Sequence, residues 1–225
     1  ESASVLAYVG SADFFHTPGG GQVDSCRARR SPGSALKPFT YALAMEENCL
    51  YPDEALYDGS LDYGLYSPEN YDGFYRGLVS ARYALKRSLN VPAVTVLDRL
   101  GADKVHGFLQ EVGLTTLEQA PDYYGLGLTL GNCEAKLEEL TKAYSMLANL
   151  GELRELRIQD DAPAPRARRV LSRGVCLATY RMLEQPLPHE FDRSVVRAAG
   201  LVPRVCWKTG TSTGHYDAWA FVFNR

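Results

Sequence analysis

A hydroxyl and an amine stand three residues apart in the stretch 31–39, as Ser34 and Lys37. Residues i and i+3 share one face of a helix, so a helix beginning here would allow Ser34 Oγ and Lys37 Nζ to meet. An unperturbed serine is a poor nucleophile and needs an adjacent base. Lys37 can serve if it is neutral, and both the helix dipole and burial lower the pKa of an amine in a first helical turn. The pair therefore predicts a nucleophilic serine, with the free N–H groups of that turn available for a developing oxyanion.

Taken alone, a Ser-x-x-Lys pair is a weak signal. It is expected about once by chance in a chain of this length and average composition. A capped surface helix accounts for it without any chemistry. The other polar groups of the chain decide between the two interpretations.

A second polar pair, Ser88 and Asn90, lies between two predicted helices. The first helix is expected over 78–89, and Pro92 can occupy the first turn of the next one. Serine and asparagine are also common at helix ends for capping reasons alone. The pair thus adds weight only in combination with Ser34.

The stretch 204–212 has the pattern of a strand and contains Lys208, Thr209, Gly210 and Thr211. The lysine and the threonine hydroxyls can hold a carboxylate through charge-assisted hydrogen bonds. Gly210 allows close approach of another backbone, so an extended peptide substrate is predicted to pair along the strand. The Thr211 N–H is a candidate second oxyanion donor, a group typically worth about 10²–10³ in rate. Strict alternation puts Lys208 on the face opposite the threonines, so we expect a kink at Gly210.

Composition is that of an ordinary soluble globular protein. Apolar residues make up 45% of the chain and charged residues 23%, with a net charge of −3 and a pI of about 5.9. This balance does not favour a nucleic-acid partner, and the basic run 27–30 is either solvated or favours an anionic ligand near Ser34. No stretch approaches the roughly 20 apolar residues of a membrane span, and no signal peptide opens the chain.

Cysteine and histidine usage does not indicate a metal site. The five cysteines show no C-x-x-C spacing and are accompanied by four histidines, so zinc is not expected. The odd count leaves at least one thiol outside intrachain pairing. His16 is predicted to lie in a loop rather than to act as a base.

Hydrophobic patterns predict an α+β fold. Strands are expected over 4–14, 204–212 and 218–224, giving one antiparallel sheet built from both ends of the chain. Helices are expected over 34–47, 78–89, 92–100, 102–112, 134–150 and 172–184. The aromatic segment 49–77 is interpreted as a long loop, either packed or forming a groove wall. The glycine-rich run 124–131 lacks G-x-G-x-x-G after a strand, which excludes a dinucleotide site.

These elements suggest one domain over 1–225 with two lobes. The sheet lobe is expected at 1–47 and 185–225, and an all-helical lobe at 48–184. The active site is expected in the cleft between the two.

In their order, Ser34-x-x-Lys37, Ser88-x-Asn90 and Lys208-Thr209-Gly210 resemble the three motifs of penicillin-binding proteins and serine β-lactamases. The flanking stretches GSALKPF, YSPENYDGFYRG, SLNVPAV, GLGLTLG and KTGTSTGHYDAWA resemble the transpeptidase domain of bifunctional class A penicillin-binding proteins, most of all those of the 1C type. This similarity runs over nearly the whole chain.

The resemblance implies a peptidoglycan D,D-transpeptidase that needs no cofactor. Ser34 would attack the D-Ala-D-Ala carbonyl of a stem peptide and release the terminal D-alanine, and Lys37 would take the Ser34 proton. An amine from a neighbouring strand would then resolve the acyl-enzyme and form a cross-link. β-Lactams mimic the dipeptide and would acylate Ser34 and stay.

The resemblance also assigns the other site residues. Ser88 would relay a proton to the leaving amine, with Lys208 holding it in place. Asn90 would bond the substrate amide and Lys37. Thr209 and Thr211 would bind the substrate carboxylate, next to Gly210.

Several expectations concern the longer protein. The family carries a membrane anchor and an N-terminal glycosyltransferase domain, and it works on the periplasmic side of the bacterial inner membrane. Its sheet continues beyond the strand at 218–224 with another strand and a terminal helix, so we expect a fragment truncated at its C-terminus. The second motif has Leu89 where the S-D-N form has aspartate, a difference that transpeptidases commonly allow.

Two alternatives share the same nucleophile. A serine β-lactamase needs a device for rapid hydrolysis of the acyl-enzyme, and the E-x-x-L-N loop of its class A form is not found between Asn90 and Lys208. A β-lactam sensor, or a non-catalytic peptidoglycan-binding domain, would bind without transferring the acyl group to an amine.

Overall fold

The computed structural model describes residues 3–64, 66–158, 165–186 and 205–224. Its helical elements are η1 (Thr17–Gly19), η2 (Gly33–Leu36), α1 (Lys37–Glu46), α2 (Ala81–Lys86), α3 (Asn90–Leu100), α4 (Ala102–Glu111), α5 (Pro121–Tyr124), η3 (Gly125–Leu130), α6 (Leu137–Ala148), α7 (Arg173–Leu183) and η4 (Thr213–His215), where η marks 3-10 helices. Its strands are β1 (Ala55–Asp58), β2 (Gly77–Ser80), β3 (Glu152–Leu153), β4 (Arg168–Arg169), β5 (Glu184–Gln185), β6 (Val205–Thr211) and β7 (Ala218–Phe223). None of these helices is long and apolar enough to cross a membrane.

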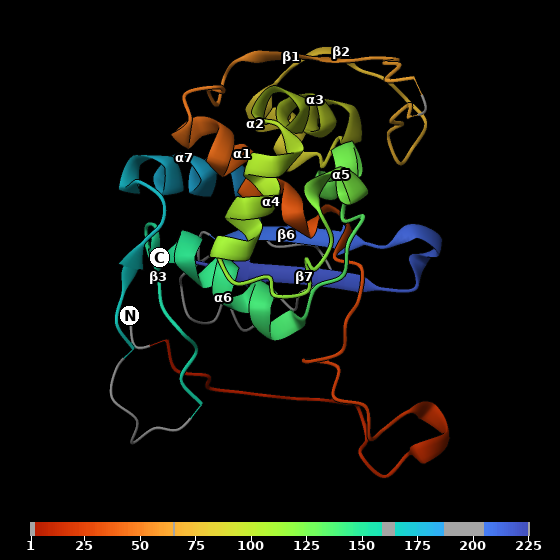
Figure 1. The fold of residues 1–225 in the computed structure, drawn as a ribbon, viewed down its shortest axis with the longest axis vertical. Coiled ribbons are helices and arrows are strands. Elements are labelled where there is room, and N and C mark those ends of the chain that lie inside the picture. Colours follow the sequence, from red (N-terminus) through yellow and green to blue (C-terminus); the bar gives the residue numbers. More distant parts are fainter. Residues whose placement is uncertain (1–2, 65, 159–164, 187–204, 225) are drawn as a thin grey trace.

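The main sheet carries the third sequence motif. It is antiparallel, with the strand order β5-β6-β7, and in β6 and β7 it confirms the two strands predicted near the C-terminus. Both strands are rich in aromatic and β-branched residues, which suit a half-buried pleated surface. In Figure 1, β6 and β7 cross the middle of the molecule, with α1 to α5 above them and the N-terminal segment below.

The N-terminal stretch does not join this sheet. Among the described residues of 4–14, the only β-pairing is a single parallel bridge between Ser4 and Arg157. Leu6 and Val9 are exposed, so the alternating pattern has no buried face here. The α+β class is confirmed, whereas the expected pairing of 4–14 with the C-terminal strands is not observed in this structure. Alternation predicts an extended segment but does not select its partner.

Helices cover the sheet through aromatic contacts. The ring of Tyr144 in α6 stacks on Phe221 of β7, with centroids 4.3 Å apart, and meets Phe39 of α1 edge-on at 5.0 Å. Tyr180 of α7 contacts Phe223 in the same edge-on way. Both α6 and α7 fall within the range predicted for the helical lobe yet pack on the sheet; the division into two lobes stays a prediction.

The segment predicted as one irregular loop contains a small hairpin. β1 and β2 pair antiparallel, and the aromatic loop 59–76 connects them. The strands are four residues each, which is too short for a period-2 pattern to stand out. The remaining predicted helices are confirmed within a few residues of their expected ends, and all five cysteines are free thiols.

Candidate active site

The turn that carries Ser34 is pressed between two other segments of the chain. Ser34 lies in η2, directly before α1, and the side chain of a residue at Gly210 would collide with the carbonyl of Pro32. A side chain at Gly131 would collide with the backbone of Gly33 in the same way. These two glycines therefore let β6 and the end of η3 approach the Ser34 turn closely.

Hydrogen bonds fix the same turn at both ends. Trp219 Nε1 donates to the Ser31 carbonyl at 2.8 Å, and Tyr144 OH donates to the Ala35 carbonyl at 2.7 Å. The Ser31 hydroxyl donates to the Gly131 carbonyl at 2.9 Å. The backbone around Ser34 is thus held by α6, β7 and η3 together.

The geometry of β6 differs from the prediction at Gly210. The β6–β7 register runs without interruption through Gly210↔Trp219 and Thr211↔Ala218, so the expected kink is absent. Lys208 is buried, and Thr209 lies on the exposed face as alternation requires. The close approach that Gly210 permits is used by the chain's own turn at Pro32, where the sequence predicted a substrate strand.

Lys37 is the first residue of α1 and is completely buried. Its Nζ donates to the Ser88 carbonyl at 2.6 Å and to Asn90 Oδ1 at 2.7 Å. Burial, and then the nearby charge of Lys208, hold the pKa of Lys37 well below its usual range. A neutral amine has two N–H donors, both satisfied by these acceptors, and one lone pair that remains able to take a proton.

The direct contact predicted between Ser34 and Lys37 is not observed. Within the described residues no hydrogen bond joins Ser34 Oγ to Lys37 Nζ, because the amine is drawn toward Ser88 and Asn90. Ser34 also lies in a 3-10 turn, so the ideal i, i+3 geometry of an α-helix does not apply. Catalytic hydrogen bonds are often long before substrate binds, so the pairing stays a prediction.

Ser88 connects the two lysines. It joins α2 to α3 in a left-handed conformation with φ of 58°, which is rare and costly for a non-glycine residue. This conformation turns its carbonyl toward Lys37, while its Oγ accepts a hydrogen bond from Lys208 Nζ at 2.8 Å. Lys208 Nζ also donates to the Thr209 carbonyl at 2.7 Å, and burial lowers the pKa of Lys208 to about 7.

Asn90 is supported by the loop 59–76. Its Nδ2 donates to the Glu69 carbonyl at 2.7 Å, and its N–H donates to Asn70 Oδ1 at 2.8 Å. Asn70 in turn donates to Asp58 Oδ1 at 2.7 Å, and both of these residues are buried. The loop therefore serves as a positioning element for Asn90. The sequence did not reveal the roles of Asn70 and Asp58, whose only signal was two polar residues within an aromatic segment.

The two oxyanion donors predicted from the sequence, the N–H groups of Ser34 and Thr211, are not used by the helix or strand that carries them. Ser212 N–H donates to the Asp217 carbonyl at 3.0 Å, toward β7. Because N–H directions alternate along an antiparallel strand, the preceding Thr211 N–H points away from β7. The Ser34 N–H lies in the first turn of η2, where N–H groups have no acceptor within the helix. Their joint action on an oxyanion stays a prediction.

An aromatic bridge spans the loop 59–76 and the β6–β7 turn. Tyr71 OH and His215 Nε2 lie 2.7 Å apart and share a hydrogen bond, and the two rings meet edge-on. Asp217 of the same turn pairs with Arg30 at 3.3 Å, just before the Ser34 turn. These contacts tie together the segments that bring the site residues into one place.

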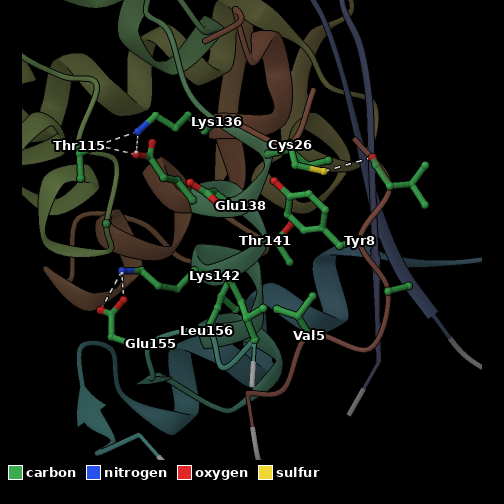
Figure 2. A pocket seen from close by; sticks show the side chains of 16 residues that line it. Val5, Tyr8, Cys26, Thr115, Lys136, Glu138, Thr141, Lys142, Glu155 and Leu156 are labelled. Atoms are coloured by element: carbon green, nitrogen blue, oxygen red, sulfur yellow. Dashed lines mark hydrogen bonds and ion pairs between the residues drawn. The ribbon is translucent and has the colours of Figure 1, made fainter. Parts of the chain in front are cut away.

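Two cavities differ in their relation to these residues. A cavity of about 310 Å³ is lined by Ser88, Lys208 and Thr209. A larger one, of about 560 Å³, lies between the N-terminal segment and α6, and none of the predicted site residues lines it. Figure 2 shows Val5 and Tyr8 on one side of this larger cavity and the ion pair of Lys142 with Glu155 on the other.

Comparison with known proteins identifies the family. Residues 1–216 match the family model described as the penicillin binding protein transpeptidase domain. The chain belongs to this transpeptidase family. The family expected from the three motifs is thereby confirmed.

Individual relatives agree with the assignment. The chain is 40% identical over 223 residues to penicillin-binding protein 1C of Escherichia coli, covering 98% of this chain and 28% of that protein. It is 32% identical to penicillin-binding protein 1A of Aquifex aeolicus, covering 100% of this chain and 31% of that protein. The chain therefore spans about three tenths of the length of these relatives.

A solved structure supports the transpeptidase fold. Penicillin binding protein 3 from Mycobacterium tuberculosis matches with a TM-score of 0.67 over 84% of this chain and 49% of that chain, at 22% sequence identity. At this identity the likeness concerns the fold alone. It agrees with the mixed helices and antiparallel sheets described above.

Proposed function

We propose that the chain is the D,D-transpeptidase domain of a bifunctional peptidoglycan synthase and that it acts through an acyl-enzyme on Ser34. The observation that carries the proposal is the convergence of two buried lysines on Ser88. Lys37 reaches it from the Ser34 turn and Lys208 from β6. Burial keeps both amines less basic than usual, as a proton-transfer role requires.

The proposed acylation step begins at Lys37. Its free lone pair takes the proton of Ser34 Oγ, which attacks the carbonyl between the two D-alanines of a stem peptide. The N–H groups of Ser34 and Thr211 stabilise the oxyanion. Thr209 and Thr211 hold the terminal carboxylate on the exposed face of β6, next to Gly210.

Collapse of the intermediate requires a proton on the leaving amine. Ser88 Oγ gives this proton and recovers one from Lys208 Nζ, which lies 2.8 Å away. Asn90 bonds the substrate amide through the part of its side chain not used by Lys37. An acceptor amine then attacks the ester, and a cross-linked peptide leaves. A β-lactam follows the first step only and remains on Ser34.

The context of the longer protein is part of the proposal. The relatives are penicillin-binding proteins 1C and 1A by name and are more than three times as long as this chain. We therefore place the domain on the periplasmic side of the inner membrane, behind a membrane anchor and an N-terminal glycosyltransferase domain. Its partners are peptidoglycan stem peptides as donor and acceptor, and β-lactams as inhibitors. No nucleic acid and no cofactor are involved, and the whole of residues 1–225 forms one domain.

The test is intact mass after incubation with benzylpenicillin, followed over hours, with Ser34→Ala as the control. A single lasting adduct that is lost in the variant is expected. Rapid loss of the adduct with turnover would indicate a β-lactamase instead. A lasting adduct, combined with no transfer of a peptide acyl group to any amine, would indicate a sensor. Failure of the unmodified chain to form an adduct contradicts the proposal.

A further inference from the structure

The cavity beside Ser88 extends away from the nucleophile. Ser88, Lys208 and Thr209 form one end of it, and the remaining wall comes from the loop 59–76, the end of α2 and the strands β5 and β6. Of the described residues, neither Ser34 nor Thr211 lines it. A ligand that occupies this space therefore meets the site at Ser88, Lys208 and Thr209.

The cavity wall is strongly cationic. Arg76, Lys86 and Arg87 line it, against a single carboxylate from Asp72. Asp72 is already engaged in an ion pair with Arg76, and Lys86 Nζ donates to the Glu184 carbonyl at 3.3 Å. Arg87 makes no ion pair with any residue that the structure describes. Its guanidinium is therefore available for an anion.

Arg87 is placed next to the reacting groups by the end of α2. Its N–H donates to the Tyr83 carbonyl at 2.8 Å and closes the helix, and Ser88 follows in its left-handed conformation. The arginine and the serine that faces Lys208 are thus consecutive residues on one rigid corner. An anion held by Arg87 lies beside whatever is bonded to Ser88 Oγ.

Reaction symmetry indicates what that ligand is. Acylation expels an amine at Ser88, and deacylation by an acceptor amine is the same step in reverse. The acceptor nitrogen must therefore occupy the position that the leaving amine vacated. The part of the acceptor beyond its nitrogen then has to extend into the space on the Ser88 side.

We propose that this cavity is the acceptor subsite and that Arg87 selects acceptors with a side-chain carboxylate, in addition to the carboxylate next to the attacking amine, which takes the place of the D-alanine carboxylate on Thr209 and Thr211. The inference rests on the proposed transpeptidase function. In the step it serves, the acceptor nitrogen bonds to the acyl carbon and the bond from that carbon to Ser34 Oγ breaks. One amine proton passes through Ser88 and the lysines to Ser34 Oγ, so the products are an amide and free serine.

The experiment compares two isosteric acceptors, D-glutamate and D-glutamine, which differ only in the charge of the side chain. Ser34 is acylated with a peptide thioester, and the two amide products are counted by mass spectrometry in a mixture of equal acceptor concentrations. The ratio does not depend on the rate of acylation. We expect D-glutamate to be favoured about tenfold by the unmodified chain, a factor typical of one charge-assisted hydrogen bond.

Variants at Arg87 test the assignment. Arg87→Gln should bring the ratio close to one, and Arg87→Glu should reverse it. Arg82→Gln is the matched control, because Arg82 belongs to the same helix but pairs with Asp53 and does not line the cavity. In the unmodified chain the preference should also fall as salt is raised, a measurement that needs no variant.

The outcomes separate the two proposals. Absence of thioester acylation at Ser34 overturns the proposed function itself. Acylation with a ratio near one in the unmodified chain, or a ratio that Arg87→Gln leaves unchanged, overturns the acceptor subsite alone. A ratio that changes equally in Arg82→Gln also counts against it.

Discussion

The cavity beside Ser88 and the larger cavity between the N-terminal segment and α6 both contain lysines, but the electrostatic surroundings of these lysines are opposite. In the first, Lys37 and Lys208 are buried against carbonyl and hydroxyl oxygens, and within the described residues neither is paired with a carboxylate. In the larger cavity, Lys136 lies 3.2 Å from Glu139 and Lys142 lies 2.9 Å from Glu155.

The contrast shows which feature indicates chemistry. A buried amine without a carboxylate is costly, and proteins retain such a group mainly where it transfers protons or holds a substrate. Lysines that are paired with carboxylates, in contrast, are explained by a structural role alone. Cavity volume would have indicated the wrong place, since the cavity of about 560 Å³ is the larger of the two but contains no predicted site residue.

Removing the amine of Lys37, which has no carboxylate partner among the described residues, should have the largest effect on the acylation rate. Lys37→Met deletes the proposed base but fits an apolar side chain into a fully buried position. Acylation by benzylpenicillin should slow by about 10²–10⁴, the range of general base catalysis. The free energy of unfolding should stay the same or rise, because folding then no longer requires an amine to give up its proton and its hydration on burial. The matched variant Lys142→Met should leave the acylation rate within about twofold, and a similar slowing in both would remove the contrast between the two cavities.

The next effect concerns the packing of the Ser34 turn. Gly210→Ala places a methyl group against the Pro32 carbonyl and Ala35, so β6 and the turn must separate. Acylation should slow by about 10- to 100-fold, and stability should fall by about 1–3 kcal/mol, as for other overpacked sites. Stopped-flow acylation and urea unfolding measure the two effects.

Gly107→Ala is the control for this substitution. Gly107 lies within α4 and has open space around it, so alanine should stabilise the helix by about 0.5–1 kcal/mol. If the two alanine substitutions affected acylation and stability equally, the turn that carries Ser34 would tolerate displacement.

A smaller effect is expected in the pH profile. Acylation needs neutral Lys37, so its rate should rise with pH as this amine loses its proton. The charge of Lys208 lowers the pKa of Lys37, and Lys208 carries that charge below a pH of about 7. Lys208→Gln removes the charge, which raises the pKa of Lys37 and moves the acid limb of the profile to higher pH. Movement of the limb to lower pH would contradict the assignment of Lys37 as the base.

The smallest effect on the reaction is expected in the larger cavity. Glu139→Gln weakens the contact with Lys136 and the 2.5 Å hydrogen bond from Thr115. Stability should fall by about 1 kcal/mol, as for one partly buried charge-assisted bond. Acylation should remain within about twofold, and a larger loss of rate would extend the functional region to this cavity.

The sequence predicted the residues that share a motif but not the contacts that assemble them. Lys37, Ser88, Asn90 and Lys208 were expected together, and hydrogen bonds join them in the structure. The expected helices also formed, because the apolar periodicity that predicts a helix lies within the helical segment itself.

Long-range contacts could not be read from local patterns. Gly131 and Asn70 act on segments roughly 100 and 20 residues away, through a close backbone approach and through bonds to Asn90. The prediction of a kink at Gly210 was wrong for a related reason. Lys208 can reach Ser88 beneath an undistorted strand because α2 and α3 deliver Ser88 to the inner face.

The two tryptophans of the chain lie next to different parts of the proposed site. Trp219 is bonded to the Ser31 carbonyl next to the nucleophile, and Trp207 lines the cavity beyond Ser88. The protein therefore carries two intrinsic fluorophores, one for each half of the proposed reaction. Acylation of Ser34 should perturb the emission of Trp219, and occupation of the acceptor side should perturb that of Trp207. Single-tryptophan variants would then allow donor and acceptor arrival to be timed separately, without any added label.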